Sequence, residues 1–363
     1  MNARALALLV AASTISMTFM TGALGLVSSA ARAQAARTPY PVVSGKAYNF
    51  EKITDGVYYA TSTGTMVTGS NNVVIAGDRD LMVVDTGTTP AAARAFVEDL
   101  KLITNKPVRY VVNTHFHYDH TDGNQVYAGK AEIIAHEYVK YAIENLNVLR
   151  REPFQTSQLT NVPNRIEDFK KQIAGETDPA RRTALEQQLV VAQRGWEELK
   201  EIKPTAPGTT YSTTKRLNLG GREVRLLFLG RGHTNGDTVV YLPGEKIVCT
   251  GDLMESQLAY MGDAQFDEWI NTLEALKKLD FGTDLPGHGV PFQGKGLITA
   301  YQNYLRDFTT QVAALRKQGR SAEMAAQEVD LTAYARYFPQ IQGRGADLRG
   351  VRRMYAWMDE KVR

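Results

Sequence analysis

The sequence predicts an α/β fold with layered packing, and three observations support this. Short apolar runs separated by glycine, asparagine and aspartate are typical of strands and occur in both halves of the chain. Segments with helical periodicity lie between and after these runs, so strands and helices mix throughout. The 363 residues are 43% hydrophobic, which is enough for one large domain with insertions.

The first half of the chain is expected to be rich in strands. Strands are predicted at residues 73–75 and 81–84, within short apolar runs that begin at residue 57. A helix should run from Pro90, which suits a first turn, to about Leu102. A buried strand over 108–112 then ends shortly before His115, and another short strand covers 133–135.

Residues from about 137 to 203 differ in character, because they are charged, poor in glycine and helical in periodicity. We interpret them as a helical insertion that is broken near Pro153, Pro163 and Pro179. Such an insertion could pack structurally, cover a site as a lid or form a dimer surface. Helicity alone does not distinguish these roles, and we favour a role in covering the site.

Strand patterns return at residues 224–229, 238–242 and 246–250, and a helix is expected at about 266–279. The tail from about 299 to 363 is again helical and then basic. Its arginines are predicted to form a solvated face: Arg344, Arg349, Arg352 and Arg353.

Residues 1–35 are predicted to be a signal peptide, and residues 36–363 the folded domain. Arg4 precedes an apolar stretch, and Ala-x-Ala cleavage sites follow at residues 31–33 and 33–35. The stretch is long, so an uncleaved membrane anchor is the alternative. Cleavage would leave a mature chain near Gln34 or Ala36 and a periplasmic or secreted protein.

Charge and cysteine content exclude several classes of partner. The formal charge is +3, and without Arg4 and Arg32 the chain keeps 40 basic against 39 acidic residues. This balance suggests neither nucleic acid nor an anionic membrane surface as partner. The expected partner is a small-molecule substrate, with no stable membrane association after signal cleavage. The single cysteine, Cys249, precludes an internal disulfide, and its strand position suggests buried core.

Seven histidines and aspartates follow predicted strands or lie in glycine-bounded turns. Imidazole and carboxylate groups are natural zinc ligands, and loops at strand ends can bring distant ligands together. His136 lies outside the pattern and is interpreted as structural. The candidate metal ligands are His115, His117, Asp119, His120, His233, Asp252 and His288.

The spacing of these residues suggests two metals. In an extended segment His115 and His117 point the same way and could bind one metal, with His233 completing its set. After a turn, the second metal would be bound by residues from two loops: Asp119, His120 and His288. Asp252 has two oxygens and could bridge both metals, which leaves open coordination for a shared water or hydroxide.

This order of motifs resembles the metallo-β-lactamase-fold hydrolase superfamily. The resemblance rests on the His-x-His-x-Asp-His array at 115–120 followed by His233, Asp252 and His288, and covers residues 48 to 291. It implies an αβ/βα sandwich with the site at one edge between two sheets; the helical insertion and helical tail would be additions. Asp85, in Val-Asp-Thr-Gly, resembles a family motif and would orient a ligand histidine or a loop.

The resemblance favours an aspartate-bridged branch, similar to glyoxalase II, lactonases and phosphodiesterases. A subgroup of β-lactamases has a cysteine at the position of Asp252 and often a lysine at the position of Glu255. The lysine holds the carboxylate of the drug, whereas Glu255 would repel it. Family members that oxidise persulfides with a single iron tend to lack second-site ligands, whereas this chain has Asp119, His120 and His288. The pattern therefore favours two metals and hydrolysis.

The predicted function is an exported dinuclear zinc hydrolase with two Zn²⁺ per chain. A hydroxide shared by the metals would cleave a carbonyl ester, lactone, thioester or amide, and Asp119 would orient it as a catalytic residue. Iron or manganese would suit the same ligands. Tyr118, Tyr260 and Asn235 are weaker candidates near the site. The alternatives are a β-lactamase and a non-hydrolytic metal-binding or redox accessory protein, and the sequence leaves the oligomeric state open.

Overall fold

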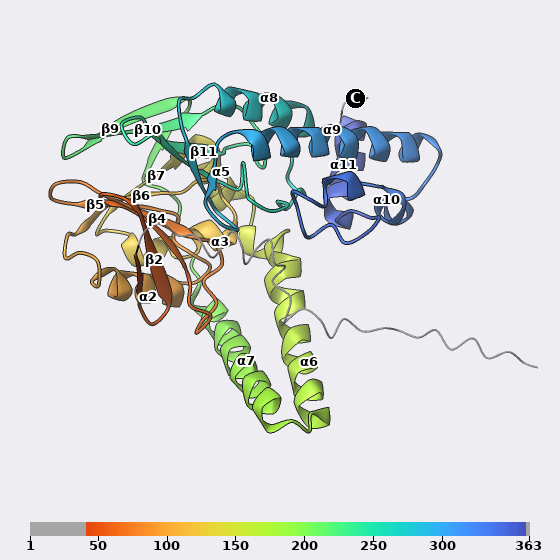
Figure 1. Cartoon of the computed structure of the whole chain (residues 1–363), viewed down its shortest axis with the longest axis horizontal. Helices are drawn as coiled ribbons and strands as arrows, with labels where there is room; N and C mark the ends of the chain where they lie inside the picture. The colour runs from red at the N-terminus through yellow and green to blue at the C-terminus, as the bar shows by residue number, and fades with distance from the viewer. Residues whose placement is uncertain (1–40, 361–363) are drawn as a thin grey trace, which may run out of the picture. The chain divides into compact units, whose positions relative to one another are not determined.

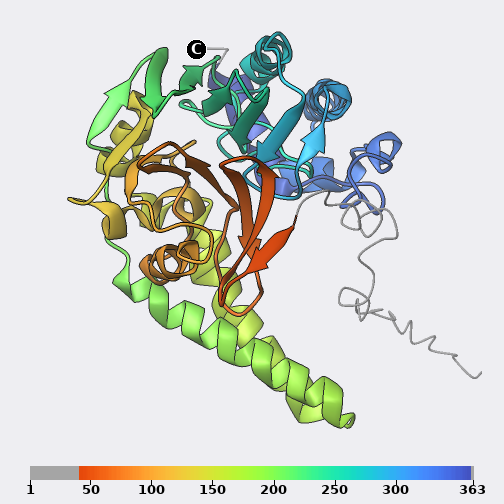
Figure 2. The same ribbon diagram turned by 60° about the vertical axis from the view of Figure 1, so that its left-hand side comes forward.

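The computed structural model describes residues 41–360, which form two β-sheets with helices on their outer faces (Figures 1 and 2). In the first sheet the eight strands follow chain order, antiparallel from β1 to β5 and parallel from β5 to β8. These strands are β1 (Val42–Ser44), β2 (Tyr48–Thr54), β3 (Val57–Ser62), β4 (Asn72–Ala76), β5 (Leu81–Val84), β6 (Val108–Val112), β7 (Glu132–His136) and β8 (Thr209–Tyr211).

The second sheet has the order β14-β13-β12-β11-β10-β9 and is antiparallel except between β12 and β13. Its strands are β9 (Thr214–Leu219), β10 (Arg222–Phe228), β11 (Thr238–Leu242), β12 (Ile247–Gly251), β13 (Thr283–Pro286) and β14 (Phe292–Gln293). The strands predicted in both halves of the chain are present, with ends that differ by at most two residues.

The core is divided by the sheets into layers. One apolar cluster combines residues of both sheets, such as Val57 and Leu226, and therefore lies between them. Alternate residues of β11 belong to different clusters: Val240 joins the layer between the sheets, and Val239 packs against the C-terminal helices. On the outer face of the first sheet, Phe96 of α2 (Pro90–Leu100) packs against the strands. The order helix, sheet, sheet, helix confirms the predicted αβ/βα sandwich.

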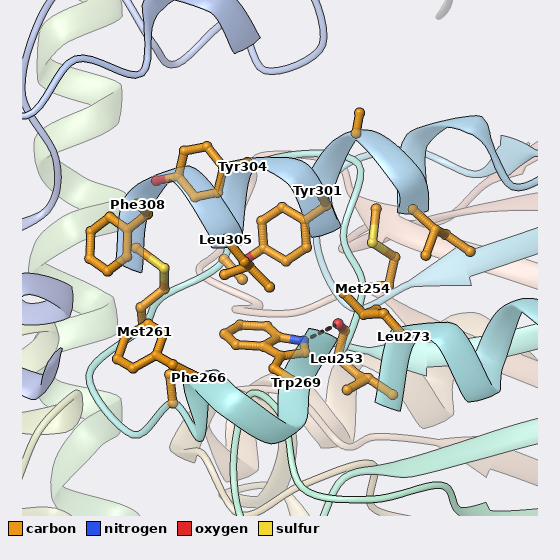
Figure 3. Close-up of a cluster of buried hydrophobic side chains, with 14 of the residues drawn as sticks. Leu253, Met254, Met261, Phe266, Trp269, Leu273, Tyr301, Tyr304, Leu305 and Phe308 are labelled. Atoms are coloured by element: carbon orange, nitrogen blue, oxygen red, sulfur yellow. Dashed lines mark hydrogen bonds between the residues drawn. The ribbon is translucent and has the colours of Figure 1, made fainter. Parts of the chain in front are cut away.

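The helices over the second sheet pack around Trp269 (Figure 3). Trp269 of α8 (Phe266–Lys277) is fully buried under Tyr301 of α9 (Gly296–Lys317), and its Nε1 donates to Leu253 O at 2.9 Å. The indole ring also lies 5.7 Å from the ring of His233. The core under the C-terminal helices therefore supports a loop that carries a candidate ligand.

Helices follow one another through the segment interpreted as an insertion. The two long ones, α6 and α7, lie side by side, and their far ends point away from both sheets (Figures 1 and 2). The helical elements here are α5 (Glu137–Asn145), a 3₁₀ turn (Val148–Arg150), a π-helical turn (Gln155–Thr160), α6 (Asn161–Gly175), α7 (Pro179–Glu198) and a second 3₁₀ turn (Leu199–Glu201).

The break predicted near Pro163 is a change of helix type and not a gap in the helix. Pro163 is the third residue of α6, which directly follows the π-helical turn Gln155–Thr160. Pro179, in contrast, begins α7 after the N-cap Asp178, whose carboxylate accepts from Arg181 N at 2.8 Å.

The tail is helical, as the sequence predicts, but only part of its basic face is solvated. Arg344 and Arg352 are exposed. The Arg353 side chain is 14% exposed and donates to Ala264 O, while the Arg349 guanidinium lies 4.8 Å from the ring centre of Tyr260. Besides α9, the tail contains α10 (Ala322–Glu328), a 3₁₀ turn (Thr332–Tyr334) and α11 (Leu348–Glu360). None of the helices in residues 41–360 is long and apolar enough to cross a membrane.

Candidate metal centre

The candidate ligands come from loops that follow strands of both sheets. His115 follows β6, and the short helices α3 (Tyr118–Thr121) and α4 (Asn124–Tyr127) continue that loop. From the second sheet, His233 follows β10, Asp252 directly follows β12 and His288 follows β13. The ends of four strands thus meet at one edge of the sandwich, and the structure brings all seven predicted residues together there.

The first cluster consists of His115, His117, His233 and Asp252, whose ligand atoms lie within 4.8 Å of one another. His117 Nδ1 lies 3.0 Å from both His115 Nε2 and His233 Nε2. Asp252 Oδ2 lies 3.7 and 3.6 Å from the same two nitrogens. Three imidazoles and one carboxylate that converge in this way form a donor set of the kind that binds zinc.

The second cluster consists of Asp119, His120 and His288. His288 Nε2 lies 3.0 Å from Asp119 Oδ2, and His120 Nε2 lies 3.7 Å from the same oxygen. Asp252 also reaches this cluster, because its Oδ1 is 3.3 Å from His120 Nε2 and its Oδ2 is 3.5 Å from His288 Nε2. Asp252 therefore lies between the two clusters, as the spacing predicts.

Two observations show that these residues fit metal ions. The first-cluster nitrogens face one another at hydrogen-bond distance, although a neutral imidazole carries only one N–H. In addition, His120 Nε2 and Asp252 Oδ1 are buried and make no well-aligned hydrogen bond within residues 41–360. Buried polar atoms are normally satisfied, and a bound cation would satisfy these facing groups.

Electrostatics differ between the clusters. Burial lowers the pKa of His115 far below its usual range and that of His233 to about 3, helped by neighbouring histidines. Both imidazoles are therefore neutral and have a free lone pair for a metal. Burial also opposes charge on His120 and His288, but Asp252 and other carboxylates raise the pKa of His120 well above normal and that of His288 to about 10. Metals bound at the second cluster would compete with protons for these histidine nitrogens.

Asp85 orients the second cluster, which confirms the role suggested by the resemblance. Its Oδ2 lies 2.8 Å from His120 Nδ1, so Nε2 is the nitrogen left to face the cluster. The same carboxylate accepts from Thr114 N and Oγ1, each at 2.8 Å, and so holds the loop before His115. Asp85 has a φ of 61°, a left-handed conformation that aspartate tolerates better than most residues.

A glycine is required where the loop after β13 approaches the clusters. A Cβ added to Gly287 would lie 2.3 Å from Asp252 Oδ1 and 2.8 Å from His120 Cε1. Both atoms belong to candidate ligands, so any side chain at residue 287 would displace one of them.

Asp263 orients the first cluster, and no sequence pattern pointed to it. Its Oδ2 lies 2.9 Å from His117 Nε2, so Nδ1 of that ring is the nitrogen left to face the cluster. Its other oxygen accepts from Arg151 Nη2 at 2.6 Å, and the Arg151 guanidinium lies over the Phe116 ring at 5.3 Å. Arg151 belongs to the helical insertion, so this segment holds a candidate ligand histidine through Asp263.

The weaker candidates mostly have packing roles. Tyr118 packs edge-on against Phe154, and Tyr260 lies edge-on to His117 with ring centres 5.6 Å apart. Asn235 is partly buried, and its Oδ1 finds no partner within the described part of the chain. Cys249 is a free, buried thiol in the layer between the sheets, as predicted.

Glu255 does not present an exposed charge at the site. The side chain is buried, and burial together with Asp252 raises its pKa to about 8. In the metal-free protein Glu255 therefore offers no exposed negative charge to repel a substrate carboxylate, in contrast to the inference from the sequence.

His136 is structural, as expected. Its Nδ1 accepts from Tyr138 N at 3.2 Å at the start of α5, its Nε2 lies 3.0 Å from Ser212 O, and its ring stacks on Phe228.

We predict that His136→Ala lowers the free energy of unfolding by about 2 kcal/mol, since two hydrogen bonds of about 1 kcal/mol each are lost. Metal content should not change. Urea unfolding and elemental analysis of the purified variant check both expectations, and loss of metal would place His136 in the site after all.

Comparison with known proteins agrees with this geometry. A linear primary-alkylsulfatase from Pseudomonas sp. is 22% identical over 243 residues, which are 64% of this chain and 44% of that protein. The alpha subunit of a 2,4-dinitroanisole O-demethylase from Nocardioides sp. is 25% identical over 240 residues, 65% of this chain and 54% of that subunit. The chain thus spans about half the length of these curated relatives.

A solved structure and a family model give the fold and the family. The sec-alkylsulfatase Pisa1 from Pseudomonas sp. superimposes with a TM-score of 0.57 and 18% identity, over 85% of this chain and 50% of that one. The model described as the metallo-beta-lactamase superfamily matches residues 65–288, a range that begins before Asp85 and ends at His288. The chain therefore belongs to the metallo-β-lactamase superfamily.

Proposed function

We propose that this protein is a dinuclear zinc hydrolase that cleaves a carbonyl ester, lactone, thioester or amide. The observation that carries the proposal is the position of Asp252 between two complete ligand clusters. His115, His117 and His233 would hold one metal, and the residues of the second cluster would hold the other. Metals bound there would act as Lewis acids and lower the pKa of a water from that of bulk to about 7.

The chain's own residues supply orientation and proton handling. Asp119 lies beside His288 with its side chain 13% exposed, and its pKa is lowered to about 2 by His120 and His288 against the effect of burial. It is therefore a carboxylate that can accept a hydrogen bond from a water and hold it in line with a substrate. Ser70 Oγ donates to Asp119 O at 2.6 Å and fixes the backbone there.

Sulfate esters are a second candidate substrate class. The observation in their favour is the similarity to a linear primary-alkylsulfatase, which includes 64% of this chain. A β-lactam and a non-hydrolytic accessory role remain alternatives, and the same assay panel distinguishes them.

The decisive experiment measures bound metal and substrate class together. Purified protein should contain about two zinc ions per chain by elemental analysis, and chelation should abolish turnover. The panel contains an aryl ester, a lactone, a thioester, an alkyl sulfate and a cephalosporin. Turnover of a carbonyl substrate supports the proposal, turnover of the alkyl sulfate alone supports the second candidate, and a single iron with no turnover contradicts both.

Removing the metals should also destabilise the protein. A ligand that binds only the folded state adds about 2.7 kcal/mol per site at a hundredfold excess over its dissociation constant. We expect a chelator to lower the midpoint of thermal unfolding by several degrees and added zinc to restore it. A midpoint that a chelator leaves unchanged would contradict two occupied sites.

We also propose export, on the basis of the apolar segment and Ala-x-Ala sites within residues 1–35, which lie outside the described residues. N-terminal sequencing of protein from the source cell should begin near Gln34 or Ala36. An N-terminus at Met1 would favour the anchor alternative.

A further inference from the structure

Three consecutive residues between β3 and β4 are each connected to a different residue of the second cluster. They are Ser70, Asn71 and Asn72, and the last of them is the first residue of β4. Ser70 and Asn72 are buried, and Asn71 is partly buried. We refer to these three residues as segment 70–72. The mechanism proposed above assigns a role to Ser70 and none to the other two residues.

Ser70 fixes the backbone of Asp119. Its hydroxyl donates to Asp119 O at 2.6 Å. The preceding Gly69 lies so close that an added Cβ would be 2.8 Å from the Cβ of Asp119, and its φ of 81° is a conformation that favours glycine. The chain before segment 70–72 therefore packs directly against Asp119, with no room for a side chain between them.

Asn71 holds the loop of His288 on both sides of the histidine. Its backbone N–H donates to Gly287 O at 2.8 Å, and its side-chain Nδ2 donates to Gly289 O at 3.2 Å. The two residues that flank His288 are thus bound by a single asparagine. Because Asn71 belongs to the first sheet and His288 to the second, these bonds cross from one half of the sandwich to the other.

Tyr59 of β3 completes this connection. Its hydroxyl accepts from Asn71 Nδ2 at 2.6 Å and donates to Pro286 O at 2.9 Å, and the ring is fully buried. The asparagine and the tyrosine together determine where the His288 loop lies relative to the first sheet. They therefore contribute to the 3.0 Å distance between His288 Nε2 and Asp119 Oδ2.

Asn72 is connected to the second cluster through Asp85. Its Nδ2 donates to Asp85 O at 2.8 Å, and the Asp85 carboxylate lies 2.8 Å from His120 Nδ1. The same carboxylate accepts from Thr114, which directly precedes His115 of the first cluster. The contacts of Asn72 therefore lead to both clusters.

We propose that segment 70–72 and Tyr59 position the ligands of the second cluster, and that Ser70, Asn71 and Tyr59 set its metal affinity independently of the first cluster. This inference rests on the proposed function. Within residues 41–360, the side-chain hydrogen bonds of Ser70 and Asn71 end on Asp119, on Tyr59 and on the His288 loop, and none ends on a residue of the first cluster. Hydrogen-bonded partners that hold metal ligands contribute about 10- to 100-fold to metal affinity.

The test titrates metal into the metal-free protein and measures the two sites separately. Tyr59→Phe removes the hydroxyl between Asn71 and the His288 loop, and Asn71→Ala removes the side-chain amide. Each variant should weaken binding at the second cluster about tenfold or more and leave the first within about twofold of the wild type. Competition with a chelating dye gives the two zinc affinities. Cadmium NMR gives one resonance per site, and the resonance that Asp119→Ala abolishes identifies the second cluster.

Tyr241→Phe is the matched control. The Tyr241 hydroxyl also donates to a backbone carbonyl, that of Asp280, at 2.9 Å. Tyr241 pairs with a residue near the start of β12, whereas Asp252 follows the end of that strand, so the control lies at the opposite end of the sheet. Both phenylalanine variants should lose some stability in the metal-free protein, and only Tyr59→Phe should also change metal binding.

Asn72→Ala should differ from the other variants by weakening both sites, because Asp85 holds residues of both. Equal weakening of the two sites in Tyr59→Phe and Asn71→Ala, or unchanged affinity at the second cluster in both, overturns the inference. If the wild type still binds two ions, either result leaves the proposed function intact. A wild type that binds a single ion contradicts the proposed function and this inference together. The measurement needs no substrate, so its result does not depend on which bond the protein cleaves.

Discussion

Replacing Asp252 with alanine should reduce bound zinc from about two ions per chain to at most one and lower kcat/KM about a thousandfold. The carboxylate oxygens lie 3.3 to 3.7 Å from histidine nitrogens of both clusters, so its loss opens both ligand sets at once. A bound metal contributes several kcal/mol to transition-state stabilisation, and each 1.36 kcal/mol is a factor of ten in rate. Elemental analysis and steady-state kinetics on the best panel substrate measure the two effects.

Asp280→Ala is the matched control for this prediction. Asp280 is an exposed aspartate of the same sheet region that pairs with Lys246 at 3.0 Å, and surface pairs contribute little to stability. Metal content and activity should therefore stay at wild-type levels. If Asp252→Ala kept two zinc ions and full activity, the bridging role and the dinuclear proposal would both be wrong.

The second large effect is expected from the ion pair that holds His117. Asp263→Ala leaves His117 Nε2 without its partner at 2.9 Å, and loss of such a partner weakens metal binding by about 10- to 100-fold. Arg151→Ala should weaken it less, because Asp263 keeps its contact with His117, and Arg151→Lys should restore part of the loss. Competition with a chelating dye measures the affinity, and the absorption spectrum of the cobalt-loaded protein reports the geometry of the first cluster.

The neighbouring Arg150 supplies the control, since it is exposed. Arg150→Ala should bind metal like the wild type. Unchanged affinity and an unchanged cobalt spectrum in Asp263→Ala would show that this carboxylate does not position His117. Lower stability without a spectral change would point to a purely structural contact.

The sandwich and its most buried strands were predictable because burial imposes a simple pattern. β5 and β12 are buried along their whole length and read as continuous apolar runs in the sequence. The strands β2, β8, β9 and β13 were not predicted. Neither were β1, which is exposed along its length, and the two-residue strand β14. Such short edge strands are defined by pairing with a neighbour rather than by their own hydrophobicity.

The candidate ligands were predictable for a different reason. Their residue types are chemically distinctive, and each stands just after a strand, where a loop can present it. Asp263 and Arg151 carry no such signal. Arg151 lies in the helical insertion and Asp263 in the loop before α8, 112 residues apart. Only folding of the chain brings both of them to His117.

The contact between Arg151 and Asp263 has a consequence for protein engineering. An inserted helical segment is a natural target for grafting, in which the segment of one protein is replaced by that of a relative to change substrate preference. Here the graft would also remove the guanidinium that steadies a ligand-holding carboxylate. A chimera that keeps the metal centre intact must therefore carry an arginine at the position of Arg151, or replace Asp263 and its partner together.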